Sequence, residues 1–126
     1  MTAGQAYLGR WARIGEAARR AREIPSNRIA ALVIVILYNA AGFADVASTV
    51  HAIAAGGSEA NPIVAEFMRS LAEYWVAPKL ASQLLVSAMV LWFPHRVVLA
   101  IFGLAVALTA GVVVNNLRVA AMLAGA

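Results

Sequence analysis

The chain contains no cysteine among its 126 residues. Disulfide bonds, thiolate metal sites and cysteine nucleophiles are therefore excluded in any compartment. Charge is also scarce, because Asp, Glu, Lys and Arg together make up 13% of the residues, whereas a soluble domain is about one quarter charged. A protein of this size with so few charged side chains cannot cover its surface in water. The sequence therefore predicts that a lipid bilayer is its main solvent.

Apolar residues make up 63% of the chain and are concentrated in three long runs. These runs cover residues 29–53, 75–93 and 97–119, and each is long enough to cross a hydrocarbon core of about 30 Å as a helix. A signal peptide is the rival interpretation of the first run, but a signal core is only about 7 to 15 residues long. We therefore expect an all-α integral membrane protein, with a three-helix bundle in a transmembrane domain of residues 28–126.

Basic residues are concentrated before the first apolar run. Six of the ten lie there, namely Arg10, Arg13, Arg19, Arg20, Arg22 and Arg28. At helical spacing, residues 1–27 divide into an apolar side and a polar side, which predicts an amphipathic interfacial helix that binds anionic lipid headgroups. A solvated basic tail is the alternative interpretation. The positive charge thus indicates membrane topology, and we expect no nucleic acid partner.

The distribution of arginine also predicts the orientation of the chain in the membrane. Arginine outnumbers acid before the first run, whereas residues 55–74 carry Arg69 against Glu59, Glu66 and Glu73. Because basic segments stay in the cytoplasm, we expect the N-terminus inside and the 55–74 loop outside. With three spans, the C-terminus is then also outside.

The connections between the apolar runs carry recognisable signals. Asn61 followed by Pro62 is an N-cap with a first-turn proline, so we expect a short helix over about residues 62–73 on the outer membrane surface. Proline, histidine and arginine at residues 94–96 predict a tight turn. The second and third runs should therefore form an antiparallel helical hairpin.

Polar side chains inside the apolar runs are costly, so each needs a partner or a role. Counting about 1.5 Å per residue places Asp45 and Lys79 at the same depth, near the outer interface. Their opposite charges predict an ion pair, formed directly or through Glu59. Other polar residues fall at the same level, and the predicted buried polar cluster consists of Asp45, Ser48, Thr49, Glu59, Asn61, Lys79, Gln83, Asn115 and Asn116.

Two interpretations of this cluster remain open. In the structural interpretation, its polar groups satisfy one another and hold the helices in register. In the functional interpretation, they form an active site or a transport pathway. The structural interpretation is favoured because no pattern of nucleophile and base is evident. Asn39, near the membrane midplane, is expected to form an interhelical hydrogen bond.

Small residues recur every four positions on the third run, at Gly103, Ala107 and Gly111. Such a stripe lets helices approach closely, so it should mark either a contact within the bundle or an oligomer face. The histidines, in contrast, are far apart: His51 ends the first span on the outside and His95 lies in the inner turn. One monomer cannot bring both to one ion. We therefore expect no metal site, no cofactor and no catalytic residues.

One set of residues carries a resemblance to a known family. In chain order they are Asn39, Asp45, Thr49, Gly57, Glu59-Ala60-Asn61-Pro62 and Lys79. In this pattern the chain resembles an uncharacterised family of small prokaryotic membrane proteins that is described only as a domain of unknown function. The resemblance covers roughly residues 36–117. It implies that four residues act together, namely Asp45, Glu59, Asn61 and Lys79, and it implies no activity. We expect the protein in a prokaryotic cytoplasmic (inner) membrane.

Three classes of function remain. The leading expectation is a non-enzymatic interaction protein, such as a subunit, assembly factor or scaffold, which forms a homo-oligomer or joins a larger membrane complex. A small ion- or proton-coupled transport protein that uses Asp45, Glu59 and Lys79 is the first alternative. A membrane-embedded enzyme or the anchor of a redox complex is the second, and the missing cysteines and separated histidines weaken it.

Overall fold

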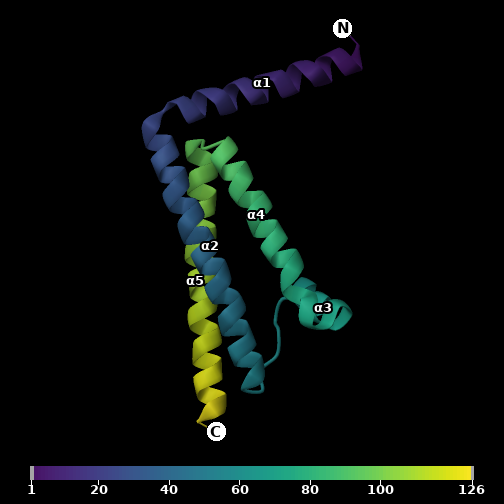
Figure 1. Ribbon diagram of the computed structural model, residues 1–126, viewed down its shortest axis with the longest axis vertical. Coiled ribbons are helices and arrows are strands. Elements are labelled where there is room, and N and C mark those ends of the chain that lie inside the picture. The colour runs from purple at the N-terminus through teal and green to yellow at the C-terminus, as the bar shows by residue number, and fades with distance from the viewer. Residues whose placement is uncertain (1, 126) are drawn as a thin grey trace.

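The computed structural model describes residues 2–125, which form helices and no strands (Figure 1). In chain order the elements are α1 (Ala3–Glu23), α2 (Pro25–Ala54), α3 (Pro62–Leu71), the 3-10 helix η1 (Ala72–Trp75), α4 (Val76–Trp92) and α5 (Arg96–Ala124). Three helical segments are long and apolar enough to cross a membrane: α2, the segment Pro62–Trp92 and α5. The predicted all-α fold with three such helices is confirmed.

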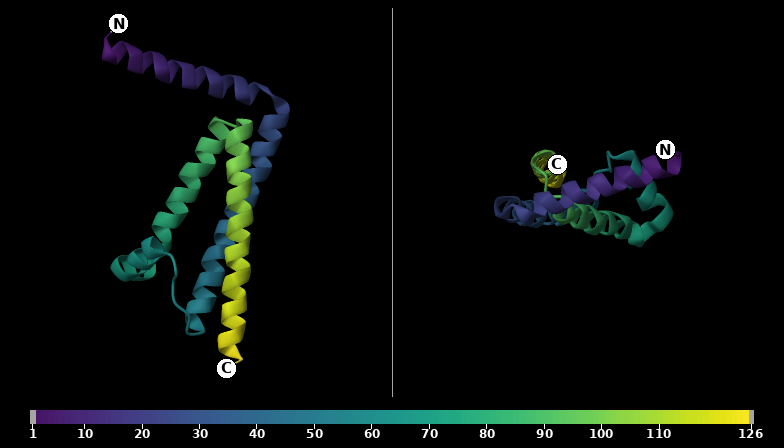
Figure 2. Two further views of the ribbon diagram at one scale, coloured as in Figure 1. Left: turned by 180° about the vertical axis from the view of Figure 1, so that it is seen from behind. Right: turned by 90° about the horizontal axis from the view of Figure 1, so that it is seen from above.

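The central helix is α2. It packs along α5 over much of its length and along α4 on another side. Helices α2 and α5 run side by side in the same direction, whereas α4 runs in the opposite direction (Figures 1 and 2). Toward its N-terminal end, α4 diverges from both of them. The interior of the protein is therefore two helix-helix interfaces that share α2.

The expected antiparallel hairpin of α4 and α5 is more open than the sequence predicted. The turn at residues 93–95 is short, and the Nδ1 atom of His95 caps α5 by accepting a hydrogen bond of 3.2 Å from the backbone N–H of Val97. Beyond this turn, within residues 2–125, α4 and α5 form no interface comparable to those with α2. The reason is that the polar partners of both helices lie on α2.

Helix α1 lies across the end of the other helices at which α4 joins α5 (Figure 1). Ala18 and Ala21 are buried there, because their small side chains let α1 lie close to α2 and α4. The guanidinium of Arg22 donates a hydrogen bond of 2.5 Å to the backbone oxygen of Trp92 and lies 5.8 Å from the centre of its ring. These contacts fix the position of α1 relative to the apolar helices.

One face of α1 carries ion pairs between its own side chains. Arg19 and Arg20 both donate hydrogen bonds to the carboxylate of Glu16. These bonds, of which those from Arg19 have the larger effect, lower the pKa of Glu16 from 4.5 to about 2. Glu16 is therefore ionised at any physiological pH, and the face combines acidic and basic groups.

Candidate functional site

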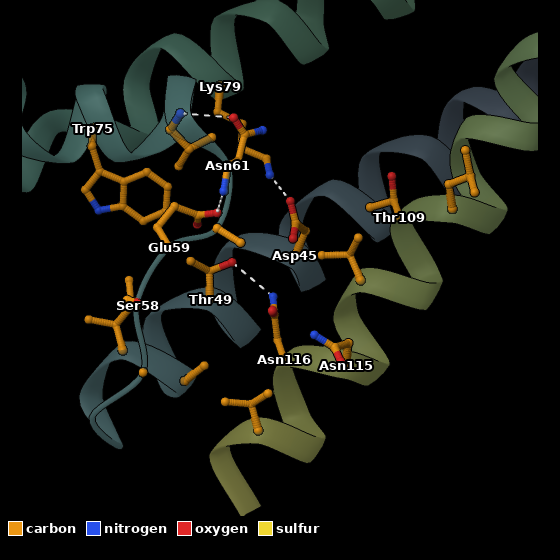
Figure 3. A pocket seen from close by; sticks show the side chains of 18 residues that line it. Asp45, Thr49, Ser58, Glu59, Asn61, Trp75, Lys79, Thr109, Asn115 and Asn116 are labelled. Carbon is orange, nitrogen blue, oxygen red and sulfur yellow. Dashed lines mark hydrogen bonds and ion pairs between the residues drawn. The ribbon is translucent and has the colours of Figure 1, made fainter. Parts of the chain in front are cut away.

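A cavity of about 530 Å³ lies where α4 diverges from α2 (Figure 3). Its walls come from α2, the loop between α2 and α3, the first turn of α3, η1, the first turn of α4, and α5. The polar and aromatic residues of this lining are Asp45, Thr49, Ser58, Glu59, Asn61, Trp75, Lys79, Thr109, Asn115 and Asn116. The volume is within the range of about 300 to 1,000 Å³ that small-molecule sites occupy. The cavity is therefore the candidate site.

Asp45 of α2 and Lys79 of α4 form an ion pair at the edge of this cavity. The Asp45 side chain is 17% exposed and that of Lys79 is 23% exposed, so water screens the pair only in part. Lys79 lies in the first turn of α4, where the helix dipole disfavours a cation. Asp45 compensates this charge. Of the two predicted arrangements, the structure therefore shows the direct pair.

Glu59 takes part in the loop instead of bridging the pair. Its Oε1 atom accepts a hydrogen bond of 2.7 Å from the backbone N–H of Asn61. The Oδ1 atom of Asn61 in turn accepts hydrogen bonds from the backbone N–H groups of Ile63 and Val64, at 3.0 and 3.4 Å. Asn61 is thus the N-cap of α3. Within residues 2–125, no basic side chain forms an ion pair with Glu59.

Asn116 links α5 to α2 beside the cavity. Its Nδ2 atom donates hydrogen bonds to the hydroxyl oxygens of Ser48 and Thr49, both at 3.1 Å. Both hydroxyl residues are buried, and Ser48 also donates to the backbone oxygen of Asp45 at 3.1 Å. Asn115, in contrast, is exposed. The predicted cluster is therefore partly satisfied by contacts inside the chain, and Asn115 lies outside these contacts.

Gln83 belongs to a separate polar layer between α2 and α4, because it does not line the cavity. Its Nε2 atom donates to Asn39 Oδ1 at 3.4 Å, and Asn39 Nδ2 donates to Ser87 Oγ at 2.8 Å. The predicted interhelical hydrogen bond of Asn39 is confirmed. Gln83 Oε1 is buried and has no hydrogen-bond partner within residues 2–125. This layer joins the two helices between the cavity and the turn at residues 93–95.

Several residues of these two sites were not predicted from the sequence. They are Gly42, Ser58, Trp75, Ser87 and Thr109. Gly42 is the single glycine of the run 29–53, and Thr109 is the single hydroxyl residue of the run 97–119. Either exception in an apolar run was a usable signal. Nothing in the sequence distinguished Ser58 from other loop residues.

The small-residue stripe of α5 makes no close contact inside the chain. A Cβ atom at Gly103 would be 3.7 Å from Ile34 Cδ1, which is ordinary van der Waals contact, and a Cβ atom at Gly111 would have no neighbour within 4 Å. Ala107 is exposed. Within residues 2–125 no bundle contact is found at Gly111, because α4 packs on α2 and leaves this side of α5 uncovered. The alternative, an oligomer face, stays a prediction.

The cavity carries groups that can bind a polar molecule. Its lining carries two carboxylates, Asp45 and Glu59, and one ammonium, Lys79. Within the described residues, no group of three or more His, Asp or Glu side chains comes together as a metal site would require. The hydroxyl and amide groups can donate and accept hydrogen bonds. The arrangement therefore offers charge recognition and hydrogen bonds to a molecule that enters it.

Comparison with known proteins places the chain in a family. No curated protein and no solved structure matches it. The model of a family described as a domain of unknown function (DUF5658) matches residues 33–123, which is more than half of the chain. The matched segment contains all the residues that line the cavity and leaves out α1. The predicted resemblance is therefore confirmed, and the chain belongs to the DUF5658 family.

Proposed function

We propose that this protein is a small, non-enzymatic interaction protein of the membrane, which associates with a second copy of itself through α5. The observation that carries the proposal is the uncovered small-residue face of α5, formed by Ala107, Gly111 and Asn115. All three residues are exposed. They follow one another at intervals of four residues and so lie on one side of the helix.

The physics of helix association in lipid supports this surface. Apolar side chains gain little by leaving lipid, so transmembrane helices associate through close packing of small residues and through interhelical hydrogen bonds. Helix α5 packs along α2, but its other sides are uncovered, and no residue of its most apolar window is fully buried inside the chain. Gly111 leaves room for the backbone of another helix. A second helix on this face would give α5 the contacts that it lacks.

Asn115 supports a second copy as the occupant. Its amide carries both a donor and an acceptor, so two copies of Asn115 can satisfy each other across a twofold axis. Residues that meet their own counterparts are typical of such symmetric interfaces. The proposed partner is therefore the same chain, although a larger membrane complex could use the same face.

The proposed setting is a prokaryotic cytoplasmic membrane, with the N-terminus inside and the C-terminus outside. Two observations support this orientation. Six arginines lie within residues 1–28, and α1 lies across the end of the apolar helices, as an interfacial helix would (Figure 1). In this orientation α1 rests on the anionic headgroups of the inner leaflet, and α3 lies at the outer surface.

The test is the oligomeric state of the full chain in mild detergent, measured by sedimentation and by cross-linking in native membranes. We expect a dimer that Gly111→Leu converts to a monomer. Ala110→Leu is the matched control, because residue 110 is also exposed but points about 100° away from residue 111. A wild-type monomer, or a dimer that survives Gly111→Leu, would contradict the proposed interface.

A transport protein is the second candidate function, and one observation favours it. The same cavity is lined by Asp45, Glu59 and Lys79, which are the residues that a transport protein is expected to use. Several copies would be needed to complete a path. The test is ion or proton flux in liposomes. Flux that is lost with Asp45→Asn but kept with Glu73→Gln, a change at an exposed residue, would support this function. Absence of flux in the wild type would exclude it.

A further inference from the structure

We propose that the cavity between α2, α4 and α5 binds an amphiphile with an ammonium head group, and that Glu59 and Trp75 hold this head group. This inference goes beyond the proposed function, because the cavity is complete within one chain. It does not depend on self-association through Ala107, Gly111 and Asn115, because of these three residues only Asn115 lines the cavity, on the side opposite Glu59 and Trp75 (Figure 3).

The charge of the lining favours a cation. Asp45 and Lys79 neutralise each other, which leaves the carboxylate of Glu59 as the uncompensated charge. Glu59 Oε1 accepts the N–H of Asn61, and the second carboxylate oxygen is left for another donor. A partly buried carboxylate without a cationic partner is unfavourable. A ligand that supplies a positive charge and N–H donors would remove this cost.

Trp75 adds a second element that recognises cations. The indole ring is the strongest of the aromatic side chains in attracting an ammonium group to its face. Trp75 and Glu59 line one side of the cavity, opposite Asn115 and Thr109 (Figure 3). An ammonium group between them would have a carboxylate and an aromatic ring as neighbours. The hydroxyl group of Thr109 on the opposite side could bind the remaining polar part of the head group.

The size and the apolar walls of the cavity indicate an amphiphile instead of a bare ion. The volume of about 530 Å³ is far more than one ion or a few waters need. Ile53 of α2 and the pair Leu108 and Val112 of α5 also line it, so an alkyl chain could continue from the head group along the apolar helices. Two sources supply this chemistry, namely a membrane lipid with an ethanolamine head group and a soluble amphiphilic amine.

The experiment is native mass spectrometry of the full chain released from lipid nanodiscs. In the first arm the nanodiscs contain equal amounts of phosphatidylethanolamine and phosphatidylglycerol. We expect one phosphatidylethanolamine molecule to be retained per chain. In the second arm the nanodiscs contain phosphatidylglycerol alone, and octylamine is added. Retention in the first arm assigns the site to a lipid, and retention in the second arm alone assigns it to a soluble amine.

The variant Glu59→Gln should lower the retained amount by about tenfold, because the charge of the site is lost. Its amide oxygen can still accept the N–H of Asn61, so the loop should keep its shape. Glu73→Gln is the matched control, since Glu73 is an exposed acid outside the cavity, and retention should be unchanged. If Glu59→Gln does not fold, Trp75→Leu should lower retention through the loss of the ring.

Three outcomes would overturn the proposal. The wild type could retain neither amine, it could retain phosphatidylglycerol in preference to phosphatidylethanolamine, or folded Glu59→Gln could retain as much as the wild type.

Discussion

Gly42 of α2 lies directly against the side-chain amide of Gln83 of α4. A Cβ atom at residue 42 would overlap Gln83 Oε1 and lie 2.5 Å from Gln83 Cδ, which is closer than real Cβ contacts come. The missing side chain lets the two helices approach at the level of Asn39 and Ser87, which join the same layer. The close approach also buries Gln83 Oε1.

This contact predicts that Gly42→Ala destabilises the protein. Helix propensity alone favours alanine by about 1 kcal/mol. The new methyl group, however, would push the buried Gln83 amide away from Asn39, and overpacking of this kind costs about 1 to 3 kcal/mol. We expect a lower melting temperature in detergent for Gly42→Ala, and recovery when Gln83→Ala is added. Gly111→Ala is the control, where open space should leave the monomer at least as stable. An unchanged melting temperature for Gly42→Ala would show that the contact does not constrain the helices.

The ion pair of Asp45 and Lys79 predicts non-additive effects of mutation. Asp45→Asn or Lys79→Met alone leaves one charge without its partner, which costs about 3 to 5 kcal/mol for a fully buried pair. We expect a smaller loss here, because the side chains are 17% and 23% exposed. The double variant should lose less stability than the sum of the single variants, measured as melting temperatures in a double-mutant cycle. Additive losses would mean that the two residues do not interact.

Asn116 and Asn115 should respond differently to the same change. Asn116→Ala removes the hydrogen bonds to Ser48 and Thr49, and interhelical bonds of this kind contribute about 1 kcal/mol in membrane proteins. The melting temperature of the monomer should therefore fall. Asn115→Ala should leave that melting temperature unchanged, since Asn115 is exposed, but should weaken the proposed dimer. Equal effects on monomer stability would contradict the assignment of one residue to the interior and the other to an interface.

The proposed topology predicts the location of the C-terminus. An enzyme that is active only outside the cytoplasm, fused after the last residue, should be active. The same enzyme fused before α1 should be inactive, because the arginines of residues 1–28 hold that segment inside. A reporter that works only in the cytoplasm serves as the inverse control. Activity of the cytoplasmic reporter at the C-terminus would rule out three spans with this orientation.

Features that depend on distance along a helix could be predicted from the sequence. Three apolar runs of sufficient length predict three membrane-spanning helices, since each residue adds about 1.5 Å. The same count placed Asp45 and Lys79 at one depth, and these two residues do meet. The N-cap at Asn61 was predictable too, because its partners lie only two and three positions further along the chain.

Which sides of the helices meet could not be predicted, because it depends on how the folded chain packs. In the folded chain Lys79 pairs directly with Asp45. Helix α4 approaches α2 closely at Gly42, whereas no helix covers Gly111. Helix α4 also turns away from α5, and this divergence opens the cavity beside α2. The physical reason is that position along a helix adds up residue by residue, whereas the choice of neighbouring helix depends on contacts between residues far apart in the chain. Small and polar residues occur on several sides of each helix, so their order in the sequence is compatible with more than one packing arrangement.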